Sequence, residues 1–220
     1  MNYRFTNRTG GVSTGAFASL NLGTHVGDNL EDVMRNRSLV ADSKDGLQFM
    51  NQVHGDRVVI IEEVVDPDPT ADALVTGIAG ISLAVQVADC IPLLLSSPEA
   101  VAAVHVGRKG LMNEVALRAI DVMLEIGASE ITAIIGPSIC GACYEVSQDV
   151  YDEVVNQHPH AQSRTKKGTL ALDLPKALIS QLSAHSLDVI NESMCTFENS
   201  DLFSYRRDGA TGRQAGIITL

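Results

Sequence analysis

The chain has 220 residues, of which 45% are hydrophobic, and it carries a formal net charge of −11 at pH 7. This length and this apolar content allow a substantial buried core. The acidity argues against nucleic acid or an anionic membrane as a partner, because phosphate groups would be repelled.

In chain order, the first expected element is a helix that begins after Asp28 or Asn29, since either side chain can cap its first turn. Four apolar segments then predict strands, at residues 58–61, 81–87, 91–95 and 101–106. The apolar residues that we expect on the inner face of this first helix are Leu30, Val33, Met34 and Val40.

The second half of the chain alternates helices with strands. Residues 111–126 show the strongest helical pattern, and Gly127 ends it. The elements expected after it are a strand at 131–135, helices that begin after Ser147 and at Asp173, and a strand at 216–220. This alternation predicts an α/β fold.

The cellular compartment is expected to be the cytoplasm. The N-terminal segment has Arg4 and Arg8 but no apolar run of the length of a secretory signal. The longest apolar region, residues 81–95, is interrupted by polar residues and by proline, so it predicts buried strands instead of a membrane span. Four cysteines are too few for a disulfide scaffold, which favours free, buried or metal-binding thiols.

Three residues near expected strand ends can carry chemistry. His54 precedes a strand, and Gly55 beside it permits close approach of a ligand. Cys90 lies between two apolar strands. His105 ends the strand at 101–106 and leads into a basic, glycine-containing turn at 107–110 before a helix, which is typical of an anion site.

Imidazole and thiolate are ligands that zinc prefers, and three protein ligands leave a fourth position for water or substrate. His54, Cys90 and His105 therefore form a candidate catalytic metal centre, although their spacings of 36 and 15 residues match no short metal motif. The same residues also fit a metal-free site, in which Cys90 is a thiolate nucleophile and His105 is its base. Both alternatives stay open.

Other polar residues are weaker candidates. Asp89 and Glu145 could act as acid or base, or could orient a metal-bound histidine. Cys140 and Cys143 have the spacing of a redox or zinc pair, but the His-x-Glu of a zinc deaminase is missing. We expect this pair to be structural or incidental. Positive charge is concentrated near the C-terminus, where Arg206, Arg207 and Arg213 fall within eight residues.

Nine motif segments occur in a characteristic order. They cover residues 10–13, 21–28, 52–55, 71–76, 88–92, 136–139, 144–146, 195–196 and 203–213. In this order they resemble the YfiH-type family, also called the laccase-domain or multicopper polyphenol oxidase family, over nearly the whole chain.

The resemblance implies a single domain over residues 1–220, with the mixed-sheet α/β sandwich of the YfiH-like type. It also implies that His54, Cys90 and His105 are the catalytic residues and bind Zn²⁺, with Cu²⁺ as a second possibility. The substrate-binding candidates in its motifs are Arg206, Lys109, Asn21, His25 and Glu145.

The activity that the resemblance implies is phosphorolysis of adenosine, inosine and methylthioadenosine, with adenosine deamination as a side activity. The expected partners are a small-molecule nucleoside and phosphate, and the oligomeric state is not predicted. One alternative is a Cys90-dependent amidase that edits peptidoglycan precursors. A less favoured alternative is a copper-dependent polyphenol oxidase, because six histidines are few for the several copper ions that such an enzyme binds. A non-enzymatic metal-binding partner of the envelope machinery is the third.

One segment departs from the family pattern. After the third candidate ligand the family usually has His-Ala-Gly-Trp-Arg-Gly, whereas residues 105–110 here are His-Val-Gly-Arg-Lys-Gly. Arg108 thus replaces an aromatic face on which a base could stack, and Lys109 replaces a planar guanidinium that grips phosphate. We expect a shifted substrate preference or a weaker activity.

Overall fold

The larger sheet of the molecule has six strands in the order β11-β8-β6-β7-β4-β3. The computed structural model describes residues 2–41 and 43–220. Strands β6, β7 and β8 pair antiparallel, whereas β3 with β4 and β8 with β11 pair parallel, so the sheet is mixed. Its strands are β3 (Val58–Ile60), β4 (Ala73–Thr76), β6 (Ile91–Ser96), β7 (Val101–Val106), β8 (Thr132–Ile135) and β11 (Asp188–Asn191).

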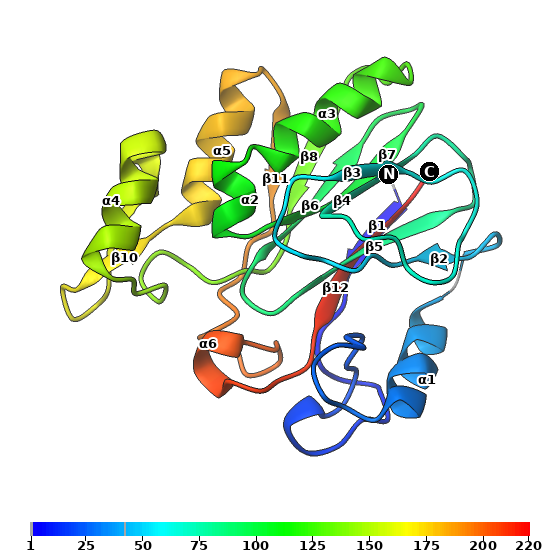
Figure 1. Ribbon diagram of the computed structural model, residues 1–220, viewed down its shortest axis with the longest axis horizontal. Coiled ribbons are helices and arrows are strands. Elements are labelled where there is room, and N and C mark those ends of the chain that lie inside the picture. Colours follow the sequence, from blue (N-terminus) through cyan, green and yellow to red (C-terminus); the bar gives the residue numbers. More distant parts are fainter. Residues whose placement is uncertain (1, 42) are drawn as a thin grey trace.

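The smaller sheet has four strands in the order β1-β12-β5-β2. They are β1 (Asn2–Phe5), β12 (Gln214–Thr219), β5 (Ser82–Val87) and β2 (Leu47–Gln48). Because β1 pairs antiparallel with β12, the first and last strands lie side by side in the middle of the molecule, and Figure 1 shows both ends of the chain close together. A separate hairpin is formed by β9 (Gln162–Arg164) and β10 (Leu170–Leu172).

Helices α2, α3 and α5 cover the outer face of the larger sheet, and α4 lies beside the β9–β10 hairpin (Figure 1). Helix α1 lies beside the smaller sheet at the opposite side of the molecule, and α6 lies near β12 (Figure 1). The helices are α1 (Leu30–Val40), α2 (Arg108–Met112), α3 (Val115–Glu125), α4 (Gln148–Gln157), α5 (Leu174–Ala184) and α6 (Tyr205–Asp208), with short 3₁₀ turns at Gly15–Phe17 and Pro159–Ala161. Within the described residues, no helix is long and apolar enough to cross a membrane.

Side chains point alternately to the two faces of each strand, and they form two main layers of the hydrophobic core. In β6, Leu93 and Leu95 belong to the core cluster shared with the helices, and Leu94 belongs to the cluster between the two sheets. These three side chains are 0% exposed. Burial of this apolar area is the dominant favourable contribution to folding. The predicted α/β sandwich is therefore confirmed.

Two helix predictions need correction. The helix expected over residues 111–126 is two helices, because α2 ends at Met112 and Glu114 adopts a left-handed conformation with φ of 60° before α3 begins. In α1, Asn29 is the cap as expected, but Leu30 and Met34 are exposed. The buried face of α1 instead contains Asn36, whose amide donates to backbone carbonyls of the N-terminal segment, and these bonds fix the helix rotation.

Candidate metal centre and substrate cavity

A cavity of about 400 Å³ opens at the end of the sandwich where β5 ends and β6 begins. The residues that line it include His54, Cys90 and His105. A neighbouring cavity of about 740 Å³ shares His25 and Gln86 with it but is otherwise lined by other side chains. The smaller cavity is therefore the one that contacts the candidate centre, and its volume is in the usual range for small-molecule sites.

Strand register explains why Cys90 and His105 meet. Strand β6 pairs antiparallel with β7, with Ile91 opposite Val106, so the residue before β6 lies beside the end of β7. His54 comes from the loop between β2 and β3 and has a φ of 59°. The three ligand atoms lie within 4.8 Å of one another, and Cys90 Sγ is 3.9 Å from His54 Nε2.

Gly107 leaves the room that this arrangement needs. A Cβ atom at this position would lie 2.9 Å from Cys90 Sγ and 3.3 Å from His54 Cδ2. Any other residue would push the thiol or the imidazole out of place, so the glycine of the basic turn packs against the centre itself.

A buried carboxylate, that of Asp72, holds two of the three residues. Its side chain accepts hydrogen bonds from the backbone N–H groups of His54 (2.9 Å) and Gly55 (2.7 Å) and lies 2.8 Å from His105 Nδ1. Because Nδ1 of His105 is occupied by this contact, Nε2 is left for a metal or for Cys90. Sequence reasoning missed this role, although a carboxylate directly before a fully buried strand is a signal for it.

Charges within the centre favour a thiolate. Burial alone would raise the pKa of the Cys90 thiol, but the charge of His105 and hydrogen bonds from His105 and His54 outweigh it, and the pKa is lowered. Burial likewise opposes protonation of His105, but Cys90 and Asp72 outweigh it and raise its pKa. The thiolate is the form that binds metals and attacks electrophiles.

The donor set fits a zinc ion. Two imidazoles and one thiolate converge, a carboxylate orients one imidazole from behind, and the side toward the cavity is open. Copper also binds two histidines and one cysteine. These donors therefore support a metal centre without fixing which metal is native.

Three arginines, Arg108, Arg206 and Arg213, contribute to the rest of the lining, which also contains Asp89. Arg206 donates to the backbone oxygen of Glu145 at 2.6 Å and lies 5.0 Å from the centre of the Tyr144 ring. Arg213 donates to the carbonyls of the residues just before β12. Backbone carbonyls hold the two arginines without neutralising them, so the cavity can accept an anion.

The state of His25 reflects this positive charge. Burial lowers the pKa of His25, and the charges of Arg213 and Arg37 lower it further. A neutral imidazole that faces a basic cavity can donate or accept a hydrogen bond from a polar ligand.

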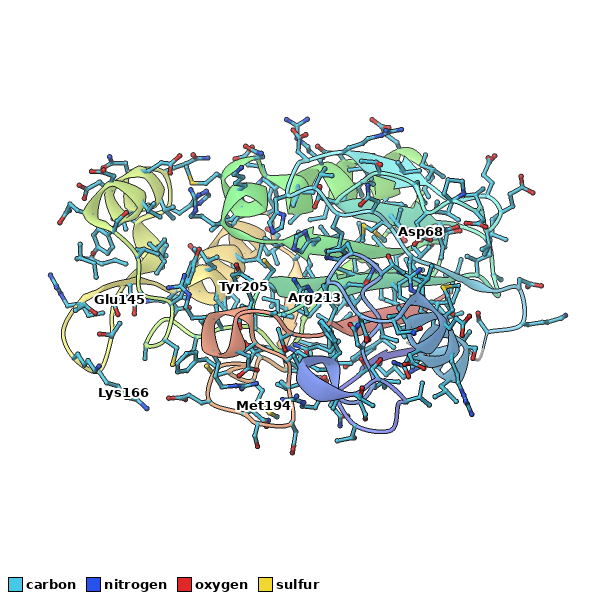
Figure 2. All side chains as sticks on the ribbon, turned by 60° about the horizontal axis from the view of Figure 1, so that its bottom comes forward. Asp68, Glu145, Lys166, Met194, Tyr205 and Arg213 are labelled. Carbon is cyan, nitrogen blue, oxygen red and sulfur yellow. The ribbon has the colours of Figure 1, made fainter. Side chains whose placement is uncertain are left out.

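The other predicted substrate residues lie differently. Asn21 is fully buried, and its side-chain Oδ1 accepts a hydrogen bond from the backbone N–H of Arg213, so it holds that segment in place. Lys109 and Glu145 have exposed side chains outside the described lining of the cavity. In Figure 2, Glu145 lies toward one end of the molecule, whereas Tyr205 and Arg213 lie nearer its middle. Their roles in substrate binding stay predictions.

Asp89 is an anchor for α6. Its carboxylate accepts hydrogen bonds from the hydroxyls of Thr196 (2.6 Å) and Ser204 (2.7 Å) and from the backbone N–H of Arg206 (2.7 Å). It thus fixes the helix that presents Tyr205 and Arg206 to the cavity. Leu174, which begins α5, also lines this cavity, and no sequence pattern indicated that it would.

The fold and the site define a mixed α/β sandwich with a His–Cys–His centre in a basic cavity. A family model described as multi-copper polyphenol oxidoreductase laccase matches residues 2–220. The chain belongs to this family, which confirms the resemblance seen in the sequence.

Similar proteins and solved structures support membership of the same family. A Corynebacterium glutamicum protein named purine nucleoside phosphorylase is 43% identical over 98% of this chain and 93% of its own. A protein of the same name from Streptomyces coelicolor is 42% identical over 100% and 95%. Among solved structures, a Neisseria meningitidis protein has a TM-score of 0.89 at 38% identity, covering 99% of this chain and 93% of its own. YfiH of Bacillus licheniformis has a TM-score of 0.83 at 32% identity, with 98% and 91% covered.

Proposed function

We propose that this protein is a purine nucleoside phosphorylase whose reactive centre is His54, Cys90 and His105. The observation that carries the proposal is the arrangement of a candidate metal centre and three arginines around one cavity of about 400 Å³. The names of the relatives support the substrate class. We further propose that residues 1–220 act as one unit.

Phosphorolysis breaks the glycosidic bond at C1′ while a phosphate oxygen forms the new bond there, and the base leaves with a proton. The transition state has oxocarbenium-like charge, so positioning of the anionic nucleophile dominates the catalysis. Arg206 and Arg213 would hold phosphate in this cavity. The Tyr205 ring and the guanidinium of Arg108 would contact the purine, because both present flat faces.

A zinc ion held by His54, Cys90 and His105 would supply Lewis acidity and an activated water. Within the protein itself, Asp72 keeps the His105 ring oriented and His54 in its loop. As a side activity, water would instead bond through its oxygen to C6 of adenosine, the C6–N bond would break, and ammonia would leave.

The geometry also favours a second candidate function. Cys90, His105 and Asp72 follow one another as thiol, imidazole and carboxylate, which is the order of groups in cysteine hydrolases. In this metal-free alternative the thiolate would attack an amide such as that of a peptidoglycan precursor. Chelation would then spare the activity and alkylation of Cys90 would abolish it, whereas the metal-dependent enzyme would lose its activity on chelation.

The test is direct. Metal-analysed protein would be incubated with adenosine or inosine, with and without phosphate, and free base would be followed by chromatography. We expect phosphate-dependent release of base that is lost in Cys90→Ala and retained in His160→Ala, which changes an exposed residue. Absence of base release from zinc-loaded wild-type protein would refute the phosphorylase and direct the search to amide substrates.

A further inference from the structure

A second group of metal-binding side chains lies outside the cavity described above. Cys140, Cys143, Cys195 and Glu198 each offer one ligand atom, and these atoms lie within 4.8 Å of one another. All three cysteines are free and half-buried. Three sulfurs and a carboxylate at this separation match the ligand number and type of a closed, four-coordinate zinc site.

The first two cysteines lie on one tight turn. The backbone N–H groups of Cys143 and Tyr144 both donate to the carbonyl of Cys140, at 3.0 and 3.1 Å. Gly141 lets this turn approach α5, since a Cβ atom there would lie 2.6 Å from the Cβ of Asp173. The turn therefore keeps the two thiols on one short loop that is packed against the body of the protein.

Backbone pairing brings the third cysteine to this turn from 55 residues away. The N–H of Ser138 donates to Met194 at 3.1 Å, and the N–H of Thr196 donates back to Ser138 at 3.2 Å. The N–H of Cys140 points at Cys195 Sγ at 3.5 Å. This contact ties the segment that contains Cys195 to the turn that contains the other two thiols.

Charge at the cluster calls for a cation. If the three thiols and Glu198 were ionised together, four negative charges would lie within 4.8 Å, and the one ion pair at the cluster that the described residues show is Lys166 with Glu198 at 2.6 Å. Figure 2 shows Lys166 and Met194, which precedes Cys195, along the same lower side of the molecule. A disulfide would use two sulfurs and leave the third thiol unmatched, whereas a divalent ion uses all the donors.

We propose that Cys140, Cys143 and Cys195 bind a structural zinc ion, with Glu198 as the fourth ligand. This ion joins the loop that ends in Tyr144 to the segment that contains Thr196. Both segments reach the cavity, because Tyr144 lines it and Thr196 donates to Asp89, the anchor of α6. The ion thus braces one wall of the cavity from behind and takes no part in the chemistry.

Zinc content per chain tests the proposal. Protein would be purified under reducing conditions, freed of loosely bound metal, and analysed as wild type, Cys143→Ser, Cys195→Ser and Cys90→Ser. We expect about two zinc ions per wild-type chain and a loss of about one in each variant. Cys90→Ser is the matched control, because it makes the same chemical change in the other cluster. The double variant Cys90→Ser/Cys143→Ser is expected to bind almost none.

Cobalt loading keeps the test valid where a variant folds poorly. In Cys90→Ser the remaining cobalt ion would keep a strong thiolate-to-metal absorption, since its three sulfur ligands are intact. Mass spectrometry of wild type would show Cys140, Cys143 and Cys195 protected from alkylation until zinc is removed. A wild-type chain that binds a single zinc ion and loses it in Cys90→Ser would overturn the proposal. A disulfide among the three cysteines under reducing conditions would overturn it as well.

Discussion

The two cysteine-containing clusters of this protein differ in the donors that surround their sulfur atoms. Around Cys90 there are two imidazoles, a buried carboxylate behind one of them, and a cavity on the open side. Around Cys143 there are two further thiols and the exposed carboxylate of Glu198. Three protein donors leave a place for substrate, whereas four close the coordination sphere. The first cluster is therefore suited to chemistry and the second to holding loops together.

The largest expected effect is on catalysis at the first cluster. Cys90→Ala should lower kcat/KM for phosphorolysis by about 10³-fold or more, because it removes a group from the reacting centre. Cys143→Ser, measured at 25 °C with zinc present, should lower kcat/KM by less than about tenfold, because its cluster only braces the cavity wall. Equal losses of kcat/KM in the two variants would contradict the assignment of different functions to the two clusters.

The thiols should also differ in how pH controls their alkylation. In metal-free protein the pKa of Cys90 is lowered to about 6, because His105 and His54 outweigh the effect of burial. Its alkylation rate should stay high from pH 9 down to pH 7 and fall as the pH drops through about 6. Burial raises the pKa of Cys143 far above its ordinary value, so its rate should still be rising at pH 9. Site-resolved mass spectrometry measures both rates, and identical pH profiles would contradict the assignment.

Removal of the carboxylate behind His105 tests the first cluster without touching a ligand. Asp72→Asn should weaken zinc binding at the first cluster by about 10–100-fold. The asparagine amide would orient the His105 imidazole less well than the carboxylate does, and it would lack the negative charge of the carboxylate. Competition with a chelator measures this affinity. Asp56→Asn, an exposed carboxylate paired with Arg118 at 3.2 Å, is the matched control and should leave the affinity unchanged.

Stability should respond to the second cluster. Cys195→Ser should lower Tm by about 4 °C or more, which for a chain of this size corresponds to about 1–2 kcal/mol. Excess zinc should raise the Tm of wild type more than that of this variant, because a ligand stabilises the state that binds it and the variant keeps only the centre at Cys90. A zinc response of equal size in both proteins would show that the cysteine is not a ligand.

The smallest expected effect concerns Arg108, which lines the cavity at the position where the sequence resemblance leads us to expect tryptophan. Arg108→Trp should lower KM for purine nucleosides by about tenfold or less with little change in kcat, because stacking acts on substrate and transition state alike. Loss of the ion pair with Glu153 should cost little, since Glu153 is mostly exposed. Lys167→Arg, an exposed position outside the described lining, serves as the control, and a similar KM change in it would remove Arg108 as the specificity residue.

Local sequence signals predicted much of the fold and the centre of the site. The apolar segments at β5, β6 and β7 were visible as such, and the pairing of consecutive strands brings Cys90 and His105 together. Asn29 was recognisable as a cap. These features depend on residues that are close in sequence, or on neighbouring strands, so periodicity and capping rules suffice.

Contacts between residues that are far apart in the chain could not be predicted from the sequence. Asp72 reaches His105 because β4 pairs with β7, with Ala73 opposite Val104, and no local pattern specifies that partner. Cys195 reaches Cys140 through a bridge to Ser138 across 55 residues. The break at Glu114 needs a left-handed residue that the helical pattern of 111–126 does not reveal. In each case tertiary contacts override what short segments indicate.

Strand β12 lies between β1 and β5, so it fills the interior of the smaller sheet instead of extending an edge. During synthesis both neighbours emerge from the ribosome before it, and each must keep an open hydrogen-bonding edge until β12 arrives. Arg213 immediately precedes β12 and enters the cavity lining with it. A nascent chain therefore carries His54, Cys90 and His105 before Arg213 and β12 are available to complete the cavity wall.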